Sequence, residues 1–216
     1  MTSTNMADIP VKLGSRDALK AALACEEAFR DSAFTRYLFP SAEPLDRGVV
    51  AMFEFVVRYA TLYGEAFAPT GAVEAVACWY GQDGLLPSFW RLVRAGGLTP
   101  ALKDREAWRR LIAVEPYLAE TRKRWMKNPH RYLDLFAVRP TLQGQGFGAT
   151  LLRHMLGRCD ASRLSCCVET FTEGNVAMYR HFGFDIVEVV QDTPLGEAVY
   201  FMVREPRPAQ EPATGS

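Results

Sequence analysis

The sequence has no excess of either charge, because 25 lysines and arginines balance 25 aspartates and glutamates. This balance argues against generic binding to nucleic acid or to a membrane surface, since both need a positive field. Long hydrophobic runs are missing too: the most apolar stretch, AMFEFVVRYATLY, is interrupted by Glu54 and Arg58 and cannot span a bilayer. The first ten residues contain no apolar signal-peptide core. We therefore expect a cytoplasmic protein without nucleic-acid or membrane partners.

Cysteine and histidine are few, and their spacing does not suggest metal ligands. The five cysteines are odd in number, no two have C-x-x-C spacing, and the three histidines show no ligand spacing with them. We expect reduced, packed thiols and no metal site.

The composition is that of one globular domain, with 216 residues of which 49 % are hydrophobic and 23 % are charged. We expect a single domain over residues 1–205. The last segment, 206–216, is rich in proline and is expected to be a disordered tail.

Hydrophobic periodicity predicts an α+β protein, with strands and helices in both halves of the chain. The expected strands are 9–13, 64–69, 72–80, 130–138, 163–169, 185–190 and 198–204. The expected helices are 15–29, 44–63, 85–94, 99–127, 144–159 and 173–182.

The sequence QGQGFG, at residues 143–148, lies between a predicted strand and a predicted helix. Glycines let an anion approach the free N–H groups at a helix start, so this loop could hold a phosphate. It is not a P-loop, because no lysine follows its last glycine.

The dinucleotide fingerprint G-x-G-x-x-G/A also fits, at Gly144, Gly146 and Ala149, and the acidic residue Glu169 stands near the end of the next strand. Two features count against it. Five residues separate the preceding strand from Gly144, and 47 residues follow Glu169, too few to complete a doubly wound sheet.

A third pattern, Q/R-x-x-G-x-G/A, fits Gln143, Gly146 and Gly148, with the strand and the helix correctly placed. With this pattern, residues 132–184 resemble the GNAT superfamily of acetyl-CoA-dependent N-acetyltransferases. The stretch LFAVRPTLQGQGFGATLL is similar to the acetyl-CoA motif of that superfamily.

The stretch ETFTEGNVAMYRHFGF resembles the second motif of the superfamily and contains Asn175 and Tyr179. The form YLxxLxVxP followed by QGQGxG is most similar to the branch of puromycin N-acetyltransferase-like enzymes, with Phe136 in place of a leucine. The resemblance covers about a quarter of the chain.

The resemblance implies the GNAT fold: a central, mixed, mostly antiparallel twisted sheet with helices on both faces and a splay between the fourth and fifth strands. Here a helical insert, about residues 82–129, would separate the third strand from the fourth. The insert carries Phe89, Trp90, Trp108, Tyr117 and Trp125, and we expect it to form a lid or wall over the acceptor site.

The resemblance also implies how acetyl-CoA is bound. Its pyrophosphate would lie on the backbone N–H groups of residues 144–149. The splay would free the backbone of Phe136 and Val138 for the pantetheine arm, and the Val138 N–H could polarise the thioester carbonyl. The residues expected to contact acetyl-CoA are Phe136, Ala137, Val138, Gln143, Gly144, Gln145, Gly146, Phe147, Gly148, Ala149, Thr150, Asn175 and Tyr179.

Direct acetyl transfer needs two proton events, because the substrate ammonium must lose a proton and the departing thiolate must gain one. The resemblance places Tyr179 near the thioester sulfur, where it could protonate the thiolate. Two carboxylates could act as the base, and we rank Glu169 first because it ends a strand near the splay. The other is Asp134.

Period-two parity places Asp134 on the same strand face as Tyr132, Phe136 and Val138.

The function that the resemblance implies is transfer of acetyl from acetyl-CoA to a primary amine of a small molecule, within a ternary complex and in a monomer or homodimer. Two alternatives remain open: a protein or peptide N-acetyltransferase, which needs an exposed groove, and a non-catalytic acyl-CoA-binding sensor.

Overall fold

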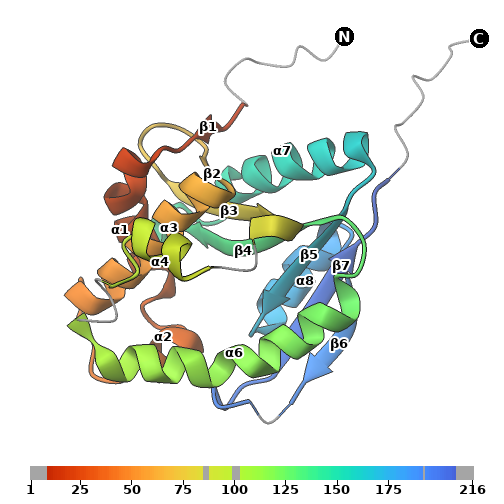
Figure 1. Cartoon of the computed structure of the whole chain (residues 1–216). Helices are drawn as coiled ribbons and strands as arrows, with labels where there is room; N and C mark the ends of the chain where they lie inside the picture. The colour runs from red at the N-terminus through yellow and green to blue at the C-terminus, as the bar shows by residue number, and fades with distance from the viewer. Residues whose placement is uncertain (1–8, 85–87, 99–102, 192, 208–216) are drawn as a thin grey trace, which may run out of the picture.

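The fold is built around one seven-stranded sheet with the strand order β1-β2-β3-β4-β5-β7-β6 (Figure 1). The computed structural model describes residues 9–84, 88–98, 103–191 and 193–207. Strands β4 and β5 pair in parallel, and the other neighbours pair antiparallel, so the sheet is mixed. The strands are β1 (Val11–Lys12), β2 (Glu65–Ala68), β3 (Ala75–Gly81), β4 (His130–Val138), β5 (Ser165–Thr170), β6 (Asp185–Val190) and β7 (Val199–Arg204).

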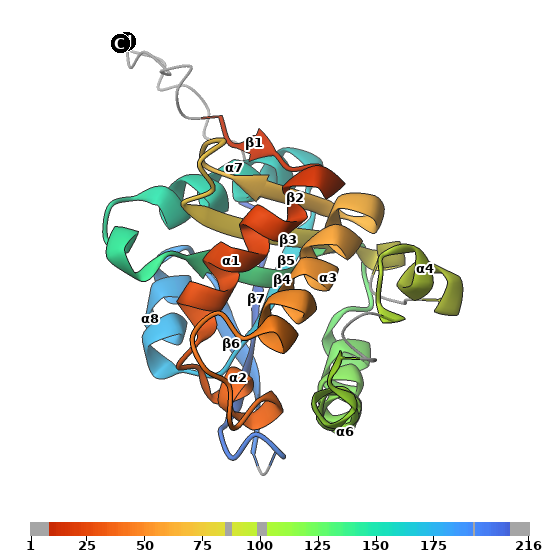
Figure 2. The ribbon, with the colours of Figure 1, turned by 90° about the vertical axis from the view of Figure 1, so that its left-hand side faces the viewer.

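Helices cover both faces of this sheet, as Figures 1 and 2 show together. Helices α1 and α3 pack on one face, and α7 and α8 pack on the other. The helices are α1 (Ala18–Phe29), α2 (Ala33–Leu38), α3 (Arg47–Tyr63), α4 (Phe89–Arg94), α6 (Arg105–Trp125), α7 (Phe147–Ser162) and α8 (Glu173–His181). No helix in the described part of the chain is long and apolar enough to cross a membrane.

Strand β3 shows why the core forms two layers. Its side chains alternate in direction, as a strand requires, and nearly all of them are buried. Val76, Cys78 and Tyr80 join the layer under α1 and α3, whereas Ala75, Ala77 and Trp79 join the layer under α7 and α8.

Short polar side chains fix where several helices begin. The Asp46 carboxylate accepts hydrogen bonds from the N–H groups of Gly48 and Val49, so α3 starts at Arg47 and the expected start at residue 44 was wrong. The Ser32 hydroxyl caps α2 by accepting from the Thr35 N–H at 3.1 Å. We had not predicted α2, because six residues are too few to show a helical period.

Strands β4 and β5 pair only over their first halves. Their register runs from His130 opposite Ser165 to Leu133 opposite Val168, although β4 continues to Val138. From Asp134 onward β4 has β3 as its strand partner on one side and no strand on the other. The predicted splay between the fourth and fifth strands is therefore confirmed.

The predicted helical insert between the third and fourth strands is also confirmed, and its largest element is α6. Figure 2 shows α6 end-on and set apart from α1 and α3. Arg110 of α6 donates to the carbonyl oxygens of Tyr37 and Leu38, and Trp125 donates to the Glu188 carboxylate at 2.7 Å. These contacts attach the first half of α6 to α2 and its last residue to β6.

Several expected boundaries were too generous. The helices expected over 85–94 and 99–127 span 89–94 and 105–125, with 85–87 and 99–102 lying outside the described residues. The helix expected over 144–159 spans 147–162. The expected tail lies outside the described residues from 208 onward.

Arg204 ties β7 to α7 and should carry an unusual share of the stability. Its guanidinium donates to both oxygens of Asp160, at 2.7 and 2.8 Å, and to the Phe182 carbonyl at 3.1 Å. Arg204→Ala should lower the free energy of unfolding by about 2–4 kcal/mol, because it removes the guanidinium from the Phe182 carbonyl and leaves the Asp160 carboxylate with the Arg207 N–H as its remaining donor. Urea unfolding followed by circular dichroism measures this change.

Arg109→Ala is the matched control. Arg109 also contacts a carboxylate, Glu106, but its side chain is 77 % exposed, so the loss should stay within about 0.5 kcal/mol. Equal losses in the two variants would contradict the stabilising role of Arg204.

Candidate active site

A cavity of about 1170 Å³ lies where β4 leaves β5, with α1, α3, α6, α7 and α8 contributing to its wall. It brings together most of the residues selected from the sequence. Gln145 and Thr150 were also selected but do not line it. Those that do are Asp134, Phe136, Ala137, Val138, Gln143, Gly144, Gly146, Phe147, Gly148, Ala149, Glu169, Asn175 and Tyr179.

The start of α7 presents free backbone N–H groups to this cavity. The first helical hydrogen bond runs from Thr150 N–H to Gly146 O at 3.0 Å, so the N–H groups of Phe147, Gly148 and Ala149 have no partner inside the helix. Gly144 and Gly146 have φ values of +77° and +90°, which other residues rarely adopt. The loop therefore forms a cradle that suits an anion.

The glutamines of this loop brace it rather than point into the cradle. The Gln143 side-chain amide donates to Val138 O at 3.3 Å, and the Gln145 amide donates to Thr141 O at 3.1 Å. The Thr150 hydroxyl donates back to Gly146 O at 3.3 Å. The side chains of these three predicted residues thus shape the loop.

Gly148 lets α7 approach β4 closely. A Cβ atom at this position would lie 2.9 Å from Phe136 Cζ and 3.1 Å from Val138 Cγ2. These distances are shorter than normal packing allows, so a side chain here would push the helix start away from the strand. The missing side chain at Gly148 therefore lets the cradle lie directly against the splayed strand.

Arg153 lines the cavity and was missed from the sequence. It follows Ala149 by four residues on α7, so its side chain lies on the same helix face, and its guanidinium lies 6.0 Å from the Phe182 ring centroid. The spacing from the glycine motif was the available signal. Arg153 adds a positive charge near the cradle, whereas Gln143 is neutral and adds none.

A β-bulge changes the direction of side chains in the middle of β4. Cys78 of β3 pairs with Leu135 and the next residue, Trp79, pairs with Leu133, so Asp134 has no partner on β3. Tyr132 therefore joins the core layer under α1 and α3, whereas Phe136 and Val138 pack in the layer under α7. The expectation that all three share a face with Asp134 was wrong.

Asp134 is exposed to water in the cavity, and the protein groups that form the cavity surround it. Burial raises its pKa to about 6, and the nearby carboxylates of Glu169 and Glu115 add to the rise while the Arg122 guanidinium opposes it. No hydrogen bond or ion pair holds the Asp134 carboxylate within the described residues. Its pKa suits a proton acceptor near neutral pH.

Glu169 is already occupied by an ion pair. Arg122 of α6 donates through Nε and Nη2 to its two oxygens, at 2.8 and 3.0 Å, and through Nη1 to Glu115 at 2.8 Å. The guanidinium also lies 5.3 Å from the Tyr132 ring centroid. Burial raises the pKa of Glu169 and the contact with Arg122 opposes this rise.

Tyr179 lies in the wall of the cavity, between the rings of Phe136 and Phe184, with centroids at 6.4 and 5.5 Å. Burial raises the pKa of its hydroxyl, so the phenol stays neutral. Among the described residues the hydroxyl has no hydrogen-bond partner. Asn175 also lines the cavity, and the cap of α8 is Thr172 rather than Asn175.

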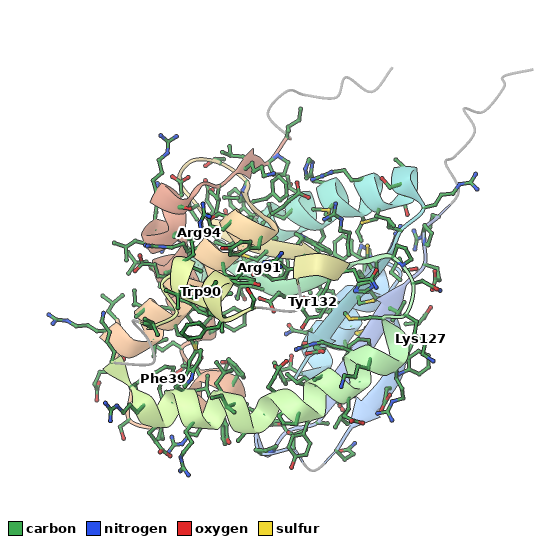
Figure 3. The ribbon with its side chains drawn as sticks, viewed as in Figure 1. Phe39, Trp90, Arg91, Arg94, Lys127 and Tyr132 are labelled. Carbon is green, nitrogen blue, oxygen red and sulfur yellow. The ribbon has the colours of Figure 1, made fainter. Side chains whose placement is uncertain are left out.

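One face of α6 forms a wall of the cavity. The lining residues of this helix recur at helical spacing and include Trp108, Leu111, Leu118 and Arg122. The insert was expected to place five aromatic residues near the acceptor site, and among the described residues Trp108 is the one of these five that lines the cavity. Trp90 of α4 is 77 % exposed. Figure 3 shows Trp90 on α4 and Tyr132 on strand β4 of the sheet.

Comparison with known proteins supports this reading of the fold. Residues 110–184 match the model of the acetyltransferase (GNAT) family. This segment contains the splayed strand, the glycine cradle, Glu169 and Tyr179.

Solved structures match nearly the whole chain. One, described as histone acetyltransferase HPA2 and related acetyltransferase from Corynebacterium glutamicum, has a TM-score of 0.62 at 16 % identity, covering 94 % of this chain and 99 % of that one. A Drosophila melanogaster polyamine N-acetyltransferase has a TM-score of 0.61 at 12 % identity, covering 91 % and 99 %. A putative arylalkylamine N-acetyltransferase of the yellow fever mosquito has 0.60 at 13 %, covering 90 % and 85 %.

The chain thus has the GNAT fold, as the sequence resemblance implied. The family match covers residues 110–184, and the structural matches extend the likeness in fold over nearly the whole chain. Members of the matched family use acetyl-CoA as the acetyl donor.

Gly148→Ala should weaken binding of coenzyme A at least about tenfold, because the added methyl group separates the cradle from β4. Isothermal titration calorimetry measures the change. Gly157→Ala is the matched control on the same helix, since nothing lies within 4 Å of the position of its Cβ. The control should bind normally and be slightly more stable. Unchanged binding in Gly148→Ala would contradict the proposed cradle.

Proposed function

We propose that the protein transfers the acetyl group of acetyl-CoA directly to a primary amine of a small molecule within a ternary complex. The observation that carries this proposal is one cavity that joins an anion cradle, a splayed strand, a neutral tyrosine and an unpaired carboxylate. Each of these meets one need of the reaction. The resemblance to puromycin N-acetyltransferase-like enzymes remains a prediction.

The residues present fit a CoA thioester. The pyrophosphate would be held by the N–H groups at the start of α7, with Arg153 near it, and Asn175, which lines the same cavity, would contact the pantetheine arm. The edge of β4 between Asp134 and Val138 that does not pair with β5 offers backbone groups to the same arm, apart from the Val138 carbonyl, which accepts from Gln143. The bound thioester supplies an electrophilic carbonyl and a thiolate leaving group.

Asp134 is the residue we assign as proton acceptor for the substrate ammonium, directly or through one water molecule. Glu169, which we ranked first from the sequence, is engaged by Arg122 and serves better as the residue that holds this guanidinium in place. Tyr179 would keep its proton, because burial raises the pKa of its phenol, and would donate a hydrogen bond to the sulfur as negative charge develops there. The released thiolate would then take its proton from water rather than from Tyr179. Burial strengthens that hydrogen bond, because the local dielectric is low.

The wall formed by α6 favours a small acceptor over a protein or peptide. Residues of α6 line the cavity beside the splay, where an extended chain would need an open groove. The neighbours named above include enzymes for polyamines and arylalkylamines, and a protein related to histone acetyltransferases. The sensor alternative is disfavoured by the unpaired carboxylate and phenol in one cavity.

Thiol release from acetyl-CoA, measured against amines of several classes and short peptides, tests the function. Tyr179→Phe should lower kcat at least about tenfold while binding of coenzyme A stays intact, because only the hydrogen bond to the developing thiolate is lost. Tyr117→Phe is the matched control on the outer face of α6 and should leave kcat unchanged. Binding without turnover on any amine or peptide would favour the sensor.

The pH dependence of kcat/KM tests the role of Asp134. Its raised pKa, about 6, means that the carboxyl is protonated and inactive at lower pH. We expect kcat/KM to fall as the pH drops through about 6 in the wild type, and Asp134→Asn to be slower and to lose this step. A step that persists in Asp134→Asn would assign the base to another group, with Glu169→Gln as the next variant to examine.

A further inference from the structure

The cavity wall between α3 and α6 is apolar over most of its length. We call this part the acceptor pocket and define it by six lining residues: Met52, Phe53, Phe55, Val56, Trp108 and Leu111. Four are on α3 and two are on the first half of α6. None of these side chains carries a charge or a carboxamide, so the pocket offers an apolar surface with aromatic rings on both sides.

Charge is concentrated at the other end of α6, beside the splay. Glu115, Asp134 and Glu169 face one guanidinium, that of Arg122, so three negative charges against one positive charge give −2 when all are ionised. Arg122 binds Glu115 and Glu169, and among the three carboxylates Asp134 is the one for which the described part of the chain provides no hydrogen bond or ion pair. This end attracts an ammonium group and repels a carboxylate.

Building on the proposed N-acetyltransferase function, we infer that the acceptor is an arylalkyl primary monoamine, with its nitrogen at Asp134 and its apolar body in the acceptor pocket. Burial of an aromatic body between α3 and α6 supplies the binding free energy. The ion pair with Asp134 fixes the nitrogen at the splay.

Other amines fit this chemistry less well. A diamine of similar length would bring a second ammonium into the acceptor pocket, where none of the six defining side chains can pair with it as it loses its hydration. An amino acid would bring its carboxylate beside three others. Glu27 and Asp31 also line the cavity, at the end of α1, and Glu27 is already paired with Arg139.

Three substrates with matched parts test the inference in the thiol-release assay: 2-phenylethylamine, 1,4-diaminobutane and phenylalanine. The first and third share a ring and an amine and differ by the carboxylate. We expect kcat/KM for 2-phenylethylamine to exceed each of the others at least about tenfold, equivalent to about 1.4 kcal/mol.

Two variants on α6 test where the ring binds. Trp108→Ala should raise KM for 2-phenylethylamine at least about tenfold and leave kcat within about twofold, because binding energy is lost equally before and during the reaction. Tyr117→Ala, on the outer face of the same helix, should change neither. If Trp108→Ala does not fold, Leu111→Ala should show the same KM effect to a smaller degree.

Each outcome decides a different claim. Equal or better turnover of 1,4-diaminobutane or phenylalanine overturns the inferred acceptor class but leaves the N-acetyltransferase function standing. An unchanged KM in a folded Trp108→Ala variant also overturns the inference. No thiol release with any amine or peptide would remove the proposed function itself.

Discussion

The site depends on the point where two parallel strands stop pairing. Strands β4 and β5 are hydrogen-bonded partners as far as Leu133 and Val168. Strand β4 then continues for five residues paired with β3 but no longer with β5. A sheet edge created inside a sheet gives backbone groups that a ligand can bind. Gly148 keeps the start of α7 against this part of β4, so the anion cradle and the free strand edge form one surface.

The bulge at Asp134 and the ion pair of Arg122 together reverse the order in which the two carboxylates were ranked as the base from the sequence. The bulge leaves Asp134 unpaired on the strand, and Arg122 joins Glu169 to Glu115 across the cavity. One carboxylate thereby holds the wall helix, and the other remains available for chemistry. The different environments, rather than the residue types, divide their roles.

Local features were predictable from the sequence, and nonlocal ones were not. The glycine loop and the bounds of β4 and β6 follow from turn chemistry and alternation over a few residues, and the structure has them where expected. The bulge depends on the register between β3 and β4, which lie about 50 residues apart. The pairing of Arg122 with Glu169 joins residues separated by 47 positions.

The acceptor side was the least predictable part. The aromatic residues of the insert can be read from the sequence, but the helix faces they occupy depend on where α6 begins. Asp104 sets this start, because its carboxylate accepts a hydrogen bond from the Ala107 N–H and caps the helix. As a result Trp108 faces the cavity and Tyr117 faces solvent. The contribution of α1 and α3 to the same cavity had no motif to mark it.

A crystal structure of the protein with coenzyme A bound tests the central claim most directly. We expect the pantetheine arm between the splayed ends of β4 and β5, the pyrophosphate on the N–H groups of residues 147–149, and the sulfur within hydrogen-bonding distance of the Tyr179 hydroxyl. Coenzyme A bound elsewhere, or a sulfur remote from both Tyr179 and Asp134, would contradict the assignment of this cavity as the active site.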